Sequence, residues 1–259
     1  MIRTALIGAA LAASVVGAAA AQDRGDNYVA ITGAFSLLQN SDNEGVFTAP
    51  FTTGAGTTIP GGTVLPAGTE VGWTTDFNNG YAVGAAFGRR YGALRGELEL
   101  AWQRSGVDTH FDVVAGGIPL GTQDAGVLVT GSPNLGVSVA DLVDDGQGGL
   151  RTIYVMANAL YDLELGGPIR PYFGGGVGVG FVDVNYSPSG VEIINDSSTK
   201  FAWQAMAGAS WALNPNAEIF AGYRYRATSD ATVEADLFAA DFEIENRGSI
   251  VEAGVRFAF

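Results

Sequence analysis

The chain has 259 residues, of which 38 are glycine, and hydrophobic residues make up 47% of it while charged residues make up only 15%. The formal net charge of −14 argues against a nucleic-acid partner, because a phosphate backbone attracts basic surfaces. Beyond the first 21 residues no apolar run reaches the about 20 residues that a transmembrane helix needs, which excludes a helical membrane protein.

Residues 1–21 have the pattern of a secretory signal peptide. Arg3 supplies a positive charge, residues 5–18 are apolar, and Ala19-Ala20-Ala21 offers a cleavage site before Gln22. A membrane-spanning helix is the alternative, but the apolar run is rich in alanine and glycine, and no cluster of charges follows it. We therefore expect residues 22–259 to form a single exported domain.

Eight segments alternate in side-chain character with a period of two, which is the pattern of β-strands with two different faces. In chain order they are 28–38, 81–89, 94–103, 151–163, 171–182, 200–213, 217–227 and 251–259. In the third segment, LRGELELAWQ, Leu98 and Trp102 lie on one face while Glu97 lies on the other. The segment 151–163 is fairly apolar on both faces, so its orientation stays open.

Short and long connections between these segments alternate. Residues 90–92, 164–168 and 214–216 are short turns, whereas the other four connections are long. The long connections are 39–76, 107–149, 185–199 and 229–246. This layout is typical of an outer-membrane barrel with periplasmic turns and extracellular loops, and an even strand number places both termini in the periplasm. Whether 39–76 and 107–149 contribute further strands stays open.

These observations predict an all-β fold: a transmembrane, antiparallel, up-and-down β-barrel of about eight strands. A closed barrel satisfies every backbone amide in lipid, and its apolar faces would point outward. Aromatic residues near the strand ends suit two interfacial girdles. The outer girdle would contain Trp102, Phe181, Phe201 and Trp203, and the inner girdle Phe87, Tyr91, Trp211 and Phe259.

The opposite faces of the same strands carry charges that would point into the barrel. They are Arg95, Glu97, Glu99, Glu218, Arg224, Arg226, Glu252 and Arg256. Side chains just fill the interior of an eight-stranded barrel, and buried charges need partners. We expect a salt-bridged plug here. The alternative is a gate or narrow ion path, as in a small porin or transporter.

The last segment, VEAGVRFAF, alternates up to a terminal aromatic residue. It resembles the C-terminal assembly signal of bacterial outer-membrane barrels. The residues that carry this resemblance are Val251, Ala253, Val255, Phe257 and Phe259. The resemblance implies that the barrel assembly machinery is a partner of this strand.

The most specific block is MANALYDLELGGPIRPYFGGGVGVGF, residues 156–181. It contains an N-x-x-Y-D pattern followed by P-Y-x-G-x-G-x-G, at Asn158, Tyr161, Asp162, Pro171, Tyr172, Gly174, Gly176 and Gly178. The chain thereby resembles the OmpA-like eight-stranded barrels, in particular the alphaproteobacterial surface-antigen branch of opacity and Msp type. The resemblance implies a Gram-negative outer-membrane protein of the cell envelope.

Three motifs could suggest other chemistry. His110 between Asp108 and Asp112 is reminiscent of a barrel protease of the omptin type, but those have ten strands, and parity places these residues on the lipid side unless a bulge intervenes. We expect a solvated loop histidine. The acidic stretch with Asp141, Asp144 and Asp145 lacks the spacing of a calcium loop. The glycines of FGGGVGVG sit in a strand without a following helix or lysine, so they do not form a phosphate loop.

We therefore expect a non-enzymatic structural protein or surface antigen without catalytic residues, cofactor or metal. Its partners would be outer-membrane lipids and lipopolysaccharide, the assembly machinery, and an external ligand or host surface contacted by the loops. The loops are acidic, since no Lys or Arg lies between Arg24 and Arg89 or between Arg104 and Arg151. Acidic loops keep a surface soluble.

Overall fold

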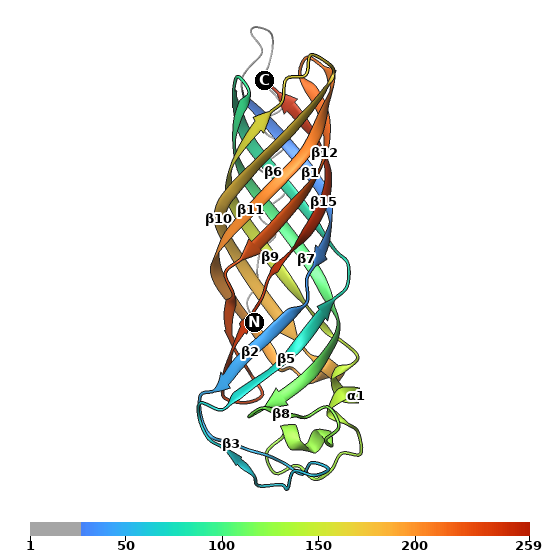
Figure 1. The fold of residues 1–259 in the computed structure, drawn as a ribbon, viewed down its shortest axis with the longest axis vertical. Helices are drawn as coiled ribbons and strands as arrows, with labels where there is room; N and C mark the ends of the chain where they lie inside the picture. Colours follow the sequence, from blue (N-terminus) through green and yellow to red (C-terminus); the bar gives the residue numbers. More distant parts are fainter. Residues whose placement is uncertain (1–26) are drawn as a thin grey trace, which may run out of the picture.

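The computed structural model describes residues 27–259, so the predicted signal peptide at 1–21 lies outside the described part of the chain. Among residues 27–259, none of the helices has the length and apolar character needed to cross a membrane. The described chain instead consists mainly of long antiparallel strands (Figure 1).

Eight long strands close into a barrel, which confirms the predicted fold class. They are β1 (Asn27–Leu38), β6 (Gly80–Tyr91), β7 (Leu94–Ala115), β9 (Gly148–Asp162), β10 (Ile169–Tyr186), β11 (Ile194–Asn214), β12 (Ala217–Thr228) and β15 (Arg247–Ala258). Each pairs antiparallel with its neighbours around the ring, and β15 closes it against β1, from Tyr28 opposite Ala258 to Leu38 opposite Gly248. Closure leaves no unpaired strand edge in this part of the chain.

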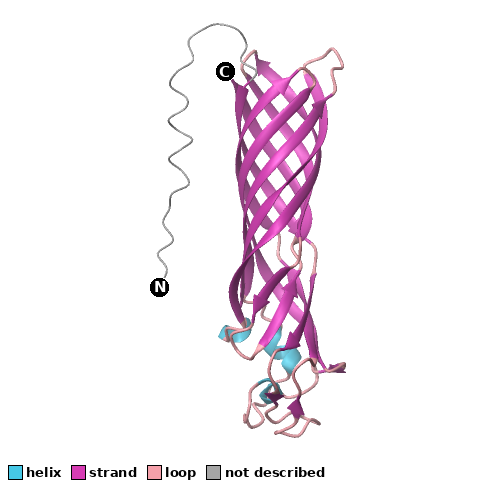
Figure 2. Ribbon diagram, turned by 90° about the vertical axis from the view of Figure 1, so that its left-hand side faces the viewer, coloured by secondary structure: helices cyan, strands magenta, loops and turns pink. Residues whose placement is uncertain are grey.

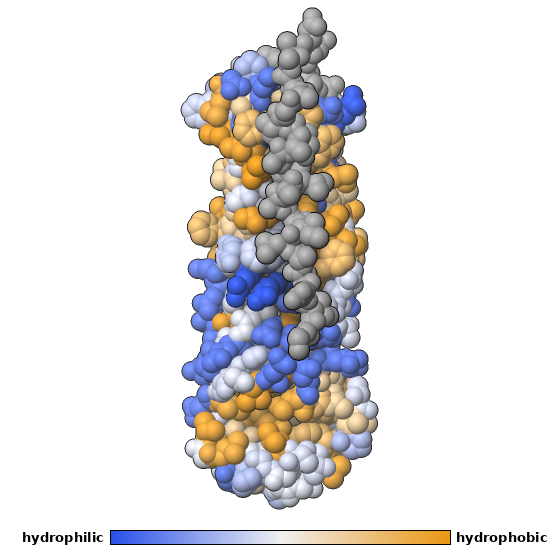
Figure 3. Space-filling view, turned by 180° about the vertical axis from the view of Figure 1, so that it is seen from behind, coloured by the Kyte–Doolittle hydropathy of each residue, from blue (hydrophilic) through white to orange (hydrophobic). Residues whose placement is uncertain are grey.

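The two faces of the barrel strands have the expected characters. Leu98 is 64% exposed on the outer face, while Glu99 is only 8% exposed inside. The orientation of β9, which the sequence left open, places Asn158 inside and Val155 outside. On the face seen in Figure 3, apolar side chains gather in a broad belt over the half of the barrel nearer the C-terminus, and a polar zone follows. The apolar belt is the surface that lipid covers.

Several barrel strands are much longer than a bilayer requires. β7 has 22 residues, β10 has 18 and β11 has 21, whereas about 9–11 residues span a membrane. Their far ends continue into a second sheet with β2 (Ser41–Phe47), β5 (Glu70–Phe77), β13 (Ala231–Glu234) and β14 (Ala240–Ile244), in the order β13-β14-β2-β5-β7. We call this part, together with the loops at its tip, the extension. The long connection 39–76 therefore does contribute strands.

The tip of the extension contains the short elements (Figure 2). They are β3 (Phe51–Thr52), β4 (Val64–Leu65), β8 (Ile118–Pro119), α1 (Val139–Val143) and two 3-10 helices at Ala125–Leu128 and Pro188–Gly190. The Asp124 carboxylate accepts hydrogen bonds from the backbone N–H groups of Gly126, Leu135 and Gly136 at 2.7–2.9 Å. One carboxylate thus holds the turns of 124–136 together.

In β10 the apolar side chains change from one face of the strand to the other, although the strand contains no bulge. Up to Phe181 its large apolar residues other than Tyr172 point outward, and from Val182 onward they point inward, while Asp183 is exposed. Pairing with both neighbours continues unbroken through this point. Apolar side chains face outward in lipid and inward in water, so the reversal marks the level, next to Phe181 and Phe201, at which the strand leaves the lipid.

Candidate functional site

All eight charged residues predicted to face the barrel interior do so, and seven of them are at most 8% exposed. Glu97 is half-buried, and the Tyr28 hydroxyl donates to its carboxylate at 2.6 Å. The strands alternate strictly here, so each charged side chain is delivered inward by its parity alone. The structure joins these residues into two networks at different heights in the barrel.

The network nearer the extension, which lies at the bottom of Figure 1, is called the upper network here. It is centred on Glu99 of β7. Its carboxylate accepts hydrogen bonds from Arg224 at 2.6 Å and from Arg226 at 2.7 Å, both on β12. Arg224 also forms an ion pair with Glu252 of β15 at 2.8 Å. Arg226 lies over the ring of Tyr154 at 4.3 Å. The network therefore spans the barrel and ties β7 to strands on the opposite side.

Two amides complete the upper network. Gln204 accepts hydrogen bonds from Arg224 and Arg226 at 2.9 and 2.8 Å, and it donates to Asn158 at 2.7 Å. Asn158 in turn donates to Glu99 at 2.8 Å. Dense hydrogen bonding of this kind is what makes buried charges tolerable, although Arg224 Nε has no partner among the described residues. Opposite Asn158 there is no room for a side chain, because a Cβ at Gly176 would overlap the amide oxygen.

The lower network lies near the short turns and is centred on Glu218. Its carboxylate contacts the guanidinium groups of Arg90, Arg170 and Arg256, with Arg170 at 2.9 Å. Beside it, Arg95 pairs with Glu97 at 3.1 Å and with Asp162 at 2.9 Å.

Sequence reasoning missed several members of these networks. It did not include Asp162, Arg90, Arg170 or the two amides among the interior residues. Asp162 could have been found, because it shares its parity with Asn158 once the orientation of 151–163 is known. Arg90 and Arg170 lie at strand ends, where they reach Glu218 from the rim, and alternation gives no signal for such contacts.

Little empty space remains between these side chains. Three voids that contact interior residues, among them Glu97, Arg226 and Glu218, have volumes of only about 20 Å³ each. Such a volume holds about one water molecule. The packed side chains neutralise one another's charges and leave little space for water, and the voids between them are too small for a substrate.

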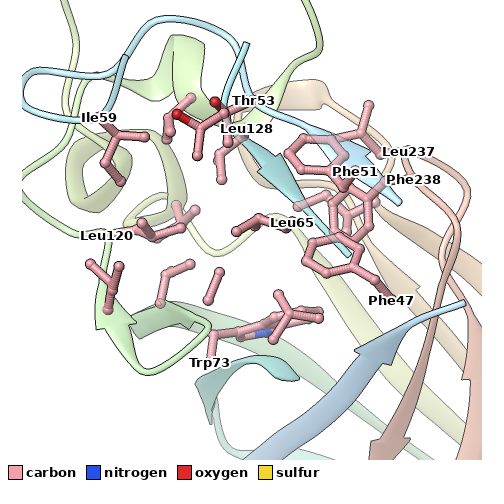
Figure 4. Close-up of a pocket in the computed structure, with 18 of the residues that line it drawn as sticks. Phe47, Phe51, Thr53, Ile59, Leu65, Trp73, Leu120, Leu128, Leu237 and Phe238 are labelled. Carbon is pink, nitrogen blue, oxygen red and sulfur yellow. The ribbon is translucent and has the colours of Figure 1, made fainter. Parts of the chain in front are cut away.

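The interior of the extension has the opposite character. Its core is apolar and includes Val182, Val184, Ile194, Phe242 and Ile244, each completely buried. Toward the tip of the extension, part of this core lines a cavity of about 280 Å³ (Figure 4). In Figure 4 the side chains of Phe47, Leu65, Leu120 and Phe238 surround it, and they come from segments far apart in the sequence.

The structure corrects the prediction that His110 is a solvated loop residue on the lipid side. His110 is only 4% exposed and lies among the residues that line this cavity. A bulge in β7 is the reason: Phe77 pairs with Val107 and Asp76 with Thr109, so one extra residue shifts the register. The inward parity of β7 therefore changes from odd to even residues before His110.

The acidic neighbours of His110 do not join it. Asp108 and Asp112 are both exposed, and Asp112 has a φ of 53° in a second irregularity of β7, where the register shifts again. Val113 consequently returns to the cavity wall. The structure therefore does not place Asp108 or Asp112 beside His110, as an Asp–His pair in a protease of the omptin type would require.

The acidic residues of 141–145 have structural contacts of their own. Asp141 accepts from Ser138 at the start of α1, Asp144 accepts from Thr109, and Asp145 binds the backbone N–H of Ser189 at 2.9 Å. Within residues 27–259 no group of three or more histidine or acidic side chains is arranged to hold a metal ion.

Hydrogen bonds fix both the position and the tautomer of His110. Thr75 Oγ1 accepts from Asn43 Nδ2 at 2.7 Å and from Trp73 Nε1 at 3.1 Å, so its own hydrogen is directed to His110 Nδ1 at 2.8 Å. Asn43 is itself oriented by Ser41, whose hydroxyl donates to its side-chain oxygen at 2.7 Å. His110 Nδ1 is thus an acceptor, and the proton of the neutral ring lies on Nε2.

Burial lowers the pKa of His110 to about 4, against a weaker opposite effect of the Asp145 charge. In the unfolded chain His110 takes up a proton below about pH 6.5, while the folded extension keeps it neutral. The contribution of neutral His110 to the stability of the extension is therefore fully present above about pH 6.5, and it is lost as the pH falls toward 4. Between pH 7 and pH 5 we expect a loss of about 2 kcal/mol in local stability.

Amide hydrogen exchange of β5 and the outer half of β7, corrected for intrinsic rates, measures this loss. His110→Phe should remove the difference between pH 7 and pH 5, because it removes the titrating group. An equal pH effect in both proteins would assign the titration to other residues.

The residues of the C-terminal segment lie on the outer face of β15. Val251 and Phe257 are 53% and 48% exposed, and the ring of Phe259 lies 6.4 Å from that of Phe87, between centroids. Ala253 and Val255 pair with Gly33 and Ile31 of β1. The segment is therefore the strand that closes the barrel.

Comparisons with known proteins find a matching family and several similar proteins and structures. Residues 68–247 match the profile of a family described as surface antigen. Over 97 residues the chain is 31% identical to outer membrane protein PagN of Salmonella typhimurium; this match covers 36% of the chain and spans about two fifths (41%) of PagN. The structure of Neisserial surface protein A covers 92% of this chain and 100% of its own, with 15% identity and a TM-score of 0.46. For OprG of Pseudomonas aeruginosa the corresponding values are 91%, 97%, 12% and 0.47.

Proposed function

The chain belongs to the surface antigen family of outer-membrane β-barrels, and from this premise we propose that it acts without catalysis, as a plugged barrel that holds a folded extension outside the cell. The observation that carries the proposal is the contrast between its two halves. Charged networks fill the barrel, whereas the extension has its own apolar core and carries the exposed surface. The block 156–181 supports a place in the opacity and Msp branch.

The runner-up is a small porin, and conductance in planar bilayers separates the two. We expect the purified protein to give no steady channel, because the voids in the barrel hold about one water each. The double variant Glu99→Ala/Arg224→Ala removes one charge of each sign from the upper network, and it should raise conductance above that of the wild type. A steady open channel in the wild type would favour the porin.

We further propose that the extension is extracellular and that both ends of the barrel domain, residues 22–259, are periplasmic. The chain has no cysteine, so single cysteines can report on accessibility. Asn134 lies exposed at the tip of the extension, and Asn216 lies exposed in the β11–β12 turn.

On intact cells, a membrane-impermeant maleimide should label Asn134→Cys but not Asn216→Cys. Permeabilising the outer membrane should expose Asn216→Cys to the reagent, which serves as the control for its reactivity. Labelling of Asn216→Cys alone on intact cells would reverse the proposed orientation.

Lipopolysaccharide is a proposed partner at the outer boundary of the membrane. Arg104 of β7 and Arg151 of β9 lie directly opposite each other and are exposed. They occupy the next outward-facing positions after the pair Trp102 and Ile153, on the side toward the extension. Neither forms an ion pair with the described residues. Like charges opposite each other are unfavourable. An anionic lipid headgroup at this height would neutralise them.

The last strand supports the proposed interaction with the barrel assembly machinery. This strand pairs with β1 where the barrel closes. The assembly machinery would bind its outward-facing residues, which alternate from Val251 to Phe259, before that pairing forms. The extension, rather than the barrel, is the part available to an external ligand or host surface, because it exposes side chains beyond the membrane.

A further inference from the structure

The cavity in the extension is lined almost entirely by apolar side chains. Phe47, Phe51, Leu65, Trp73 and Leu120 are among them, and no Asp, Glu, Lys or Arg takes part in the lining. Exposed residues at its edge, Ile118 at 53% and Leu237 at 36% exposure, provide access from the outside. The apolar core of the extension and the charged networks separate it from the periplasmic end, so it is a closed-ended pocket rather than part of a channel.

Two polar groups in this wall lack a hydrogen-bond partner among the described residues: Nε2 of His110 and the hydroxyl of the fully buried Tyr186. Among the described residues His110 Nε2 has no hydrogen-bond partner, although the ring is 4% exposed. The chain through Ser41, Asn43 and Thr75 directs its hydrogens toward His110 Nδ1 and leaves Nε2 as a donor. A buried donor without an acceptor is costly, and three buried residues, Ser41, Asn43 and Thr75, are arranged to maintain this one.

We propose that this cavity binds a neutral, compact lipophilic molecule that carries one hydrogen-bond acceptor, and that His110 Nε2–H donates to that acceptor. Neutrality follows from the lining, since an ion would be buried there without a partner. Size follows from the volume: an apolar cavity of about 150 Å³ accommodates benzene, so about 280 Å³ suits roughly ten carbon atoms. This inference goes beyond the proposed function and does not depend on whether the barrel conducts.

Two bicyclic probes of the same carbon skeleton test the proposal. α-Tetralone carries a carbonyl, and tetralin does not. We would titrate each into the full chain in lipid nanodiscs by calorimetry and subtract protein-free nanodiscs, because both probes partition into lipid. We expect saturable one-to-one binding of both, with α-tetralone about three- to ten-fold tighter, as the gain of one neutral hydrogen bond predicts.

Two variants separate the cavity from the donor. Leu65→Trp should abolish binding of both probes, because Leu65 projects into the cavity (Figure 4). Its matched control, Leu213→Trp, changes a residue that is 60% exposed at the opposite end of the barrel and should leave binding unchanged. His110→Phe should keep tetralin binding and lose the preference for α-tetralone, which also shows that this variant retains a folded cavity.

Three results would overturn the proposal. The first is the absence of saturable heat above that of protein-free nanodiscs. The second is binding to folded Leu65→Trp, verified by heat-modifiable gel mobility, that equals binding to the wild type, since the probes would then sit elsewhere. The third is an unchanged preference for α-tetralone in His110→Phe, since another group would then supply the hydrogen bond.

Discussion

Replacing Glu99 by alanine should lower the free energy of unfolding of the barrel by about 3–5 kcal/mol, the usual cost of removing one partner from a buried ion pair. Arg226 would lose the carboxylate that it contacts at 2.7 Å and keep only Gln204 and the Tyr154 ring. Arg224 would retain Glu252 at 2.8 Å. The stranded charge of Arg226, rather than the lost attraction itself, accounts for most of the expected loss.

Urea unfolding in lipid vesicles, followed by heat-modifiable gel mobility, measures this effect. Glu99→Gln keeps the shape and one acceptor and should cost less. Glu243→Ala, which changes an exposed glutamate of the extension, should stay within about 0.5 kcal/mol of the wild type. A loss of less than about 1 kcal/mol for Glu99→Ala would mean that water reaches Arg226 and that the barrel is not tightly plugged.

Leu98→Arg should destabilise the barrel by about 2–4 kcal/mol, the cost of an arginine on the lipid face near the bilayer midplane. Leu98 lies halfway between Leu94 at the turn and Trp102 at the outer girdle, and it is 64% exposed. Its neighbours across the strands are Phe87 and Ala157, which also face outward. The charge therefore has no polar partner within the outer face.

The matched control is Val64→Arg in the extension. Val64 is 59% exposed, so the two positions have similar accessibility, but Val64 faces water and the substitution should stay within about 0.5 kcal/mol. Equal losses for the two variants would show that the apolar belt does not lie in lipid.

Alternation predicted the barrel because it is a local property. All eight predicted segments correspond to barrel strands, and residues such as Glu99 and Arg224 could be placed inside because side chains on a strand alternate wherever it runs without a bulge. The same rule failed at His110, where one extra residue in β7 reverses the parity. The bulge is defined by the register with β5, and β5 lies in a connection whose strands the sequence did not reveal.

The sequence itself contains a signal for the reversal in β10. Phe181 and Val182 belong to two apolar series of opposite parity, and the change from one series to the other is the signal for a strand that leaves lipid and enters water. With it, the length of β10 beyond the membrane could have been predicted from the sequence.

By itself the sequence determined the class of fold, the faces of the barrel strands other than 151–163 and eight of the charges inside the barrel, because these follow from a period of two along single strands. Only the tertiary structure decided which charges pair, where Arg90 and Arg170 reach Glu218, and that His110 lies buried beside an apolar cavity. Those outcomes depend on the register between strands and on loops that meet from distant parts of the chain. No local pattern specifies where side chains from Phe47, Leu65, Leu120 and Phe238 will enclose a common space.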